Sequence, residues 1–125
     1  MIPALVVVGG GLGALGRYAL SGLVQHRSGS IRPWGTAAVN LTGAFLLGIF
    51  AGYLNSRGHF STELSPLTTG FLGGYTTFST WMVETLLLGE EGAGTGTRDA
   101  LINLVGPTVA GLSLAGIGYA LGTLV

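Results

Sequence analysis

Four apolar stretches, each long enough to cross a lipid bilayer, take up most of this chain; they cover about residues 2–24, 34–54, 64–88 and 98–124. As a helix the first would measure about 34 Å, enough for a hydrocarbon core of about 30 Å. Only 8% of the 125 residues are charged, against about 25% in soluble domains, so lipid must cover most of the surface. The sequence therefore predicts an all-α membrane protein: one transmembrane domain over residues 1–125, with four transmembrane helices joined by short loops.

Composition and local patterns exclude several classes of function. The net charge is zero and lysine is absent, which argues against binding to nucleic acid. The chain has no cysteine, so disulfides and thiolate metal sites are excluded. His26 and His59 have no second ligand at metal spacing, and we read both as solvated loop residues. No nucleophile has a base beside it and no acid pair shares a helix face, so we do not expect an enzyme.

The first stretch contains a glycine pattern typical of dinucleotide-binding proteins. Gly11, Gly13 and Gly16 match G-x-G-x-x-G, but that site also needs an acidic residue about 20 positions further on, inside a βαβ unit. The first acidic residue of the chain is Glu63. We therefore interpret Gly9, Gly13 and Gly16 as small residues that let neighbouring helices approach closely in the membrane.

The third stretch differs from the others in its middle. Gly70, Gly73 and Gly74 weaken a helix there, because each glycine costs about 1 kcal/mol relative to alanine in a helix interior. After them, hydroxyl and aromatic residues are interleaved: Tyr75, Thr76, Thr77, Phe78, Ser79, Thr80 and Trp81. In hydrocarbon a broken helix is tolerated only where protein or water satisfies its backbone, and freed carbonyls at such breaks ligate ions. The sequence therefore predicts a third helix that is broken near its middle, at an ion site.

Three polar side chains are predicted to lie inside the helices. Arg17 and Glu84 lie at similar depth, near the same side of the membrane. They either pair, face one water-filled vestibule, or extend to the headgroups; a charge inside a membrane is by default a functional hypothesis. Asn40 is either a hydrogen-bonding contact between helices or a ligand at the depth of the broken segment.

The arginines bear on orientation. With both termini on one side, that side carries Arg57 alone, whereas the other carries Arg27, Arg32 and Arg98. Because positive residues prefer the cytoplasm, this count leans toward termini outside. The bias is small enough that insertion in both orientations stays open.

Three of these segments together resemble a known family. GGGLGALGRY in the first helix, PWGTAAVNLTGAFLLG in the second and GFLGGYTTFSTW in the third are similar to the Fluc (CrcB) family of fluoride channels, and the fourth helix resembles it loosely. The resemblance implies a dual-topology dimer, two subunits inserted antiparallel in the plasma membrane, with two narrow pores along their interface. It also implies passive export of fluoride, which enters acid-exposed cells as neutral hydrogen fluoride and becomes trapped as the anion.

The resemblance further implies roles for individual residues. A structural sodium ion at the dimer interface would be held by the backbone carbonyls of Gly73 and Thr76. A second set of residues would line the pore, and a third would lie at the vestibule. The pore set is Asn40, Phe78, Ser79, Thr80 and Trp81. At the vestibule, Arg17 matches a family arginine, and Glu84 is placed there by its similar depth.

This sequence departs from the family pattern at a few positions. Trp81 takes the place of a second phenylalanine, and Asn103 and Pro107 stand where a tyrosine and a serine are expected, with Thr108 beside them. Pro107 is also expected to interrupt the fourth helix. Some members of the family are heterodimers, so the partner is either a second copy of this chain or an unlike homologous subunit.

Two alternatives from other classes remain at this point. A small multidrug-type, proton-coupled exporter has a similar size, but it depends on a carboxylate in the first helix, where this chain has only Arg17. A non-transporting membrane scaffold subunit would not need the threonine-rich break, and it predicts no ion flux.

Overall fold

A computed structural model of the chain describes residues 1–58, 66–90 and 95–125. These residues form helices and no strand. The elements are α1 (Ile2–Ser28), α2 (Trp34–Ser56), the π-helical segment η2 (Pro66–Leu72), the short α3 (Gly73–Tyr75), α4 (Ser79–Glu90) and α5 (Gly96–Gly122). His59, Glu63, Glu91 and the first two residues of the predicted third span lie outside the described residues.

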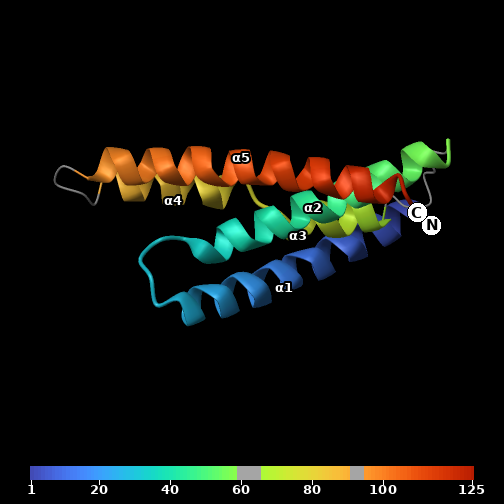
Figure 1. Cartoon of the computed structure of the whole chain (residues 1–125). Helices are drawn as coiled ribbons and strands as arrows, with labels where there is room; N and C mark the ends of the chain where they lie inside the picture. Colours follow the sequence, from blue (N-terminus) through green and yellow to red (C-terminus); the bar gives the residue numbers. More distant parts are fainter. Residues whose placement is uncertain (59–65, 91–94) are drawn as a thin grey trace.

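The helices run roughly along one long axis, and both termini lie at the same end (Figure 1). Helix α2 packs on α5 and, less extensively, on α1. The third span is divided between them: η2 and α3 pack on α1, whereas α4 packs on α5. By length and hydropathy, α1, α2 and α5 can each cross a membrane. The predicted all-α fold is confirmed. The third span is not one long helix, because α3 ends at Tyr75 and α4 begins at Ser79.

Glycines bring the backbones of neighbouring helices together. A Cβ at Gly48 of α2 would overlap the carbonyl of Ala115 in α5, and a Cβ at Gly118 would overlap the carbonyl of Phe45. Lipid supplies no hydrophobic driving force between helices, so close packing of this kind is what holds them together. The predicted close approach is confirmed at Gly9 and Gly13 of α1, whereas a Cβ at Gly16 would meet the Tyr75 ring at an ordinary contact distance of 3.6 Å. The segment is helix and not the strand and turn of a dinucleotide site.

The predicted boundary of the first loop was wrong. Helix α1 continues to Ser28 instead of ending at residue 24, and Gly29, with φ 56°, closes it. The Gln25 side chain explains the extension: its Nε2 donates to the Ser30 carbonyl at 2.7 Å, and its Oε1 accepts from the Gly35 amide at 3.1 Å. One side chain thereby ties the end of α1 to the start of α2.

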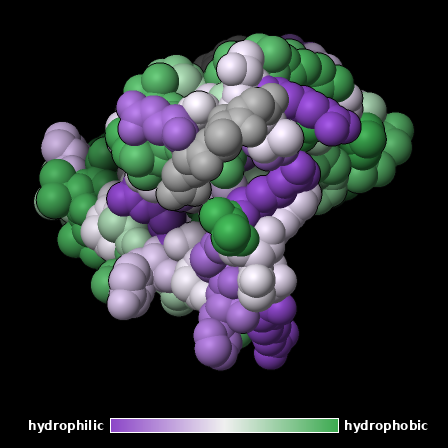
Figure 2. Space-filling model, turned by 90° about the vertical axis from the view of Figure 1, so that its left-hand side faces the viewer, coloured by the Kyte–Doolittle hydropathy of each residue, from purple (hydrophilic) through white to green (hydrophobic). Residues whose placement is uncertain are grey.

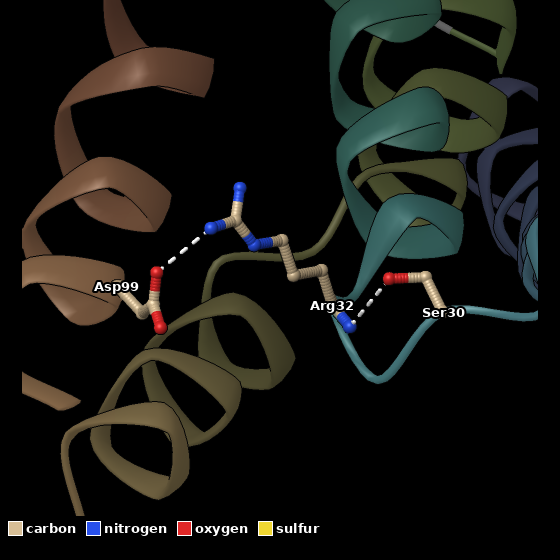
Figure 3. A network of polar contacts seen from close by, with 3 residues as sticks. All are labelled: Ser30, Arg32 and Asp99. Carbon is tan, nitrogen blue, oxygen red and sulfur yellow. Dashed lines mark hydrogen bonds and ion pairs between the residues drawn. The ribbon is translucent and has the colours of Figure 1, made fainter. Parts of the chain in front are cut away.

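The loop between α1 and α2 is also tied to α5. Arg32 donates to the Asp99 carboxylate at 2.8 Å, and its own amide donates to the Ser30 hydroxyl at 3.1 Å (Figure 3). Asp99 lies in the first turn of α5, where a negative charge also favours the helix dipole.

The other helix ends differ from prediction by about two residues: α2 and α4 run on to Ser56 and Glu90, and α5 covers Gly96–Gly122 rather than 98–124.

Pro107 lies inside α5 and does not interrupt it. A proline inside a membrane helix is tolerated where another group satisfies the carbonyl it leaves free; that group is described with the site below.

The end of the molecule that carries the α1–α2 loop is polar. Hydrophilic residues gather there between hydrophobic flanks (Figure 2). The flanks of the helices themselves expose large apolar side chains, among them Val7 and Leu12 on α1 and Leu112 on α5. This distribution suits a bundle whose ends meet water and whose sides meet lipid or another subunit.

Candidate functional site

The helix break lies at residues 76–78. Helix α3 ends at Tyr75, Thr76 is extended (φ −80°, ψ 158°), and α4 begins at Ser79. The predicted break in the third span is therefore confirmed, a few residues after the glycines that were expected to weaken it. Gly70 and Gly74 pack against α1 instead: a Cβ at Gly74 would overlap the carbonyl of Gly10, whereas nothing lies within 4 Å of a Cβ at Gly73.

Asn40 of α2 satisfies the broken backbone. Its Oδ1 accepts from the Thr77 amide at 2.8 Å, and its Nδ2 donates to the Thr77 carbonyl at 2.8 Å. One side-chain amide thus replaces both partners that a continuous helix would have given Thr77. Of the two interpretations of Asn40 from the sequence, this is the hydrogen-bonding contact between helices. Asn40 also borders the larger of two cavities at the break.

Thr77 organises the start of α4. Its Oγ1 accepts from the Thr80 amide at 3.4 Å and donates to the Thr80 hydroxyl at 3.1 Å. This is the capping contact by which a threonine satisfies a free amide at a helix start. Thr77 was noted in the sequence only as part of the hydroxyl run, although it links α2 to α4.

Two backbone carbonyls at the break bear on cation binding. In an α-helix the Gly73 carbonyl would accept from the Thr77 amide, which here donates to Asn40 instead. The Thr76 carbonyl accepts from Arg17 Nη1 at 3.3 Å. The Gly73 oxygen therefore fits a hard cation well, whereas the Thr76 oxygen would share its two lone pairs between a cation and a guanidinium.

Of the pore-lining residues predicted from the sequence, Phe78 and Trp81 lie together beside the break, whereas Thr80 borders a second, smaller cavity. Phe78 is 69% exposed, and Ser79 and Thr80 are exposed too. The rings of Phe78 and Trp81 meet edge to face, with centroids 5.9 Å apart and planes at 85°. Both rings border the larger cavity, of about 470 Å³.

Trp81 is held by α5. Its Nε1 donates to the Asn103 carbonyl at 2.8 Å. Asn103 Nδ2 donates to Thr85 Oγ1 at 2.8 Å, and Thr85 Oγ1 donates to the Trp81 carbonyl at 2.8 Å. Sequence reasoning noted Asn103 as a departure from the family and expected Pro107 to interrupt the helix, and it missed this network. The spacing of four residues between Asn103 and Pro107 could have indicated the bond, because a proline leaves the carbonyl four residues before it without its helical donor.

Arg17 and Glu84 do not pair with each other, since each has another partner. Arg17 donates to Thr76, and Glu84 Oε1 accepts from the Thr36 hydroxyl at 2.7 Å. Glu84 Oε2 is buried and has no hydrogen-bond partner among the described residues. The carboxylate therefore points inward and does not extend to the headgroups. Thr36 was missed from the sequence, although it precedes Asn40 by one helical turn and so shares its face.

A second cavity, of about 220 Å³, lies on the Arg17 side of the break. Polar side chains from α1, α2 and the third span border it, together with three less polar ones. The lining is Ala14, Arg17, Tyr18, Ser21, Thr36, Val39, Thr77 and Thr80. Thr77 borders both cavities, so the break separates a hydroxyl-rich cavity beside a guanidinium from a cavity lined by aromatic rings.

Several apolar helices around an interrupted span define a multi-pass membrane protein. The chain belongs to the CrcB family: the family model described as CrcB-like protein, Camphor Resistance (CrcB), matches residues 4–119. The resemblance seen in the sequence is therefore confirmed.

Curated relatives agree with this assignment over nearly the whole chain. A protein of Nitratidesulfovibrio vulgaris named fluoride-specific ion channel FluC is 43% identical over 122 residues, 97% of this chain and 96% of the relative. A Mycolicibacterium paratuberculosis protein named fluoride-specific ion channel FluC 2 is 45% identical over 93% of this chain and 89% of its own length. A Cutibacterium acnes protein of the same name is 40% identical over 96% of each chain.

Proposed function

We propose that this protein is a fluoride-selective channel that lets fluoride leave the cell passively across the plasma membrane and so confers fluoride resistance. The observation that carries the proposal is the interruption at residues 76–78, which leaves Phe78, Ser79 and Thr80 exposed in the middle of a membrane span. Hydroxyl donors can replace part of the water around a small, strongly hydrated anion. The positive edge of an aromatic ring can meet that anion without holding it firmly, as conduction requires.

Family membership favours this function over the two alternatives. The relatives are named channels, not proton-coupled exporters, scaffold subunits or enzymes. The structure adds that no carboxylate lies in α1, where such an exporter would need one.

The residue roles divide along the break. We assign Phe78, Ser79, Thr80 and Trp81 to the pore lining: the rings of Phe78 and Trp81 border the larger cavity, Thr80 borders the smaller one, and Ser79 is exposed beside Phe78. Asn40 borders the larger cavity but uses both atoms of its amide on Thr77, so its first task is to hold the interruption open. Arg17 and Glu84 belong to a vestibule, where Arg17 borders the smaller cavity and Glu84 is linked to it through Thr36.

The channel would be a dimer of antiparallel subunits. The exposed Phe78 and the open aromatic cavity beside it need a second wall to become a closed pore. A second copy of this chain or an unlike homologous subunit would provide it, with lipid around the outside. The small arginine asymmetry between the two ends of the bundle is compatible with both choices.

We also propose a sodium ion at the dimer interface, bound by the carbonyls of Gly73 and Thr76. The diverted helical bond of Gly73 supports it, and the Arg17 contact at Thr76 weighs against tight binding by that oxygen. Two carbonyls cannot surround a cation, so the ion would require the matching pair from the partner. Sodium would then stabilise the dimer, and exchanging it for a large organic cation should lower the melting temperature of the purified protein.

Anion-resolved efflux from liposomes tests the function. The chain is reconstituted alone, and fluoride and chloride release are recorded with ion-selective electrodes. Fluoride release far faster than chloride release supports a homodimeric channel. Fluoride release that needs a co-expressed homologous subunit supports a heterodimer. Protein that is folded and reconstituted, yet releases no fluoride in either form, contradicts the proposal.

A further inference from the structure

One hydrogen bond connects the aromatic part of the proposed pore to a proline in another helix. Pro107 has no amide hydrogen, so the Asn103 carbonyl lacks the donor that a continuous α5 would supply. The Trp81 indole Nε1 takes that place, at 2.8 Å. An unsatisfied carbonyl in the membrane and an unsatisfied indole would each be costly, and this bond resolves both.

The ring is fixed at more than one point. Besides the bond to the indole, the Asn103 side chain reaches the Trp81 backbone through the buried Thr85 hydroxyl. The indole stands perpendicular to the exposed ring of Phe78. Asn103 of α5, together with α4 itself, therefore sets the orientation of the Trp81 ring toward the aromatic cavity.

We propose that Pro107 is a positioning residue: by leaving the Asn103 carbonyl open, it draws the indole N–H of Trp81 away from the anion path. Trp81 then offers the anion only the C–H edge of its ring, as a phenylalanine would. An indole N–H facing the path would be a stronger donor and would hold fluoride too firmly for rapid conduction. This inference rests on the proposed function.

A spectroscopic experiment tests the hydrogen bond without any need for conduction. The chain has two tryptophans, so Trp34→Phe leaves the Trp81 indole as a single ¹⁵N-labelled signal. In that background Pro107→Ala restores an amide that competes for the Asn103 carbonyl, and it favours helix, so the fold is retained. We expect hydrogen exchange at the indole to quicken by about fivefold, the scale of one neutral hydrogen bond.

Asn103→Ala is the matched control, because it removes the side chain that reaches Thr85 but keeps the backbone carbonyl. The indole exchange should quicken less in this variant than in Pro107→Ala, because the bond to the indole itself remains. Equal indole exchange before and after Pro107→Ala would overturn the proposal, and so would a larger change from Asn103→Ala than from Pro107→Ala.

A double-mutant cycle then tests the consequence for conduction. Pro107→Ala is introduced into the Trp81 protein and into a Trp81→Phe protein, and fluoride flux is compared within each background. We expect a loss of about fivefold where the indole is present and no loss where it is absent. Equal losses in both backgrounds would mean that the proline acts on α5 itself, and the proposal would be wrong. If the parent chain conducts no fluoride, either alone or with a co-expressed homologous subunit, the proposed function fails, while the indole exchange still decides the positioning claim.

Discussion

The two halves of the third span are built differently. The first half, η2 with α3, lies backbone to backbone against α1: a Cβ at Gly13 would overlap the carbonyl of Phe71, and a Cβ at Gly70 would approach that of Val6. The second half, α4, contacts α5 through the Trp81 side chain near the break and comes backbone to backbone with it at its far end, where a Cβ at Gly96 would approach the Gly89 carbonyl; the first residues of α4 are exposed. We conclude that the first half anchors the span and the second half presents the polar and aromatic groups of the site.

The largest expected effect of a substitution is at the junction between the two halves, where Asn40 bonds to Thr77. Asn40→Ala removes both hydrogen bonds to Thr77 and leaves two backbone groups without partners. At about 1–3 kcal/mol for each group, the loss of stability should be about 2–6 kcal/mol. Thermal unfolding in detergent measures it, with Asn55→Ala as the control because that asparagine is exposed on the same helix. Similar melting temperatures for the two variants would mean that the break does not depend on Asn40.

The anchoring half should be intolerant of even one methyl group. Gly13→Ala forces α1 away from Phe71, and overpacking of this kind costs about 1–3 kcal/mol. Gly11→Ala is the matched control, since nothing lies within 4 Å of a Cβ there. It should leave the melting temperature unchanged or raise it, because alanine favours helix. Equal behaviour of the two variants would show that the α1 contact is not tight.

The smallest expected effect concerns the tie between the α1–α2 loop and α5. The Arg32–Asp99 pair is partly exposed, so Arg32→Ala should cost at most about 1 kcal/mol. The difference should disappear in high salt, because exposed charges are screened. Arg27→Ala, which removes an exposed arginine of the same end of the bundle, serves as the control. A loss well above that of the control at high salt would contradict a screened ion pair as the tie between this loop and α5.

The architecture could be predicted from the sequence because the features that make a membrane span lie within the residues of the span itself. Long apolar stretches, few charges and a glycine-to-threonine run are sufficient to predict four spans and a break in the third. The exact place of the break was harder to predict. It depends on Asn40, 37 residues away from Thr77 along the chain, and no local propensity encodes such a partner.

The site was predictable to the extent that its residues are neighbours in sequence. Phe78 and Trp81, three residues apart, do form one aromatic pair. The partners of Glu84, Arg17 and Trp81 come from other helices, so these contacts needed coordinates. The expectation that Pro107 interrupts α5 was wrong for the same reason, because Trp81 supplies the missing donor from outside the helix.

The most direct test of the account compares one aromatic residue from each half of the third span. Phe71 stacks on Tyr75 with ring centroids 5.7 Å apart, within the anchored half, whereas Phe78 is exposed at the start of α4. Fluoride efflux and thermal unfolding are measured for Phe71→Ile and Phe78→Ile. We predict that Phe78→Ile reduces efflux to the background of empty liposomes with the dimer and its melting temperature intact, and that Phe71→Ile lowers the melting temperature but conducts. Undiminished efflux from Phe78→Ile would contradict the claim that the interrupted segment carries the ion.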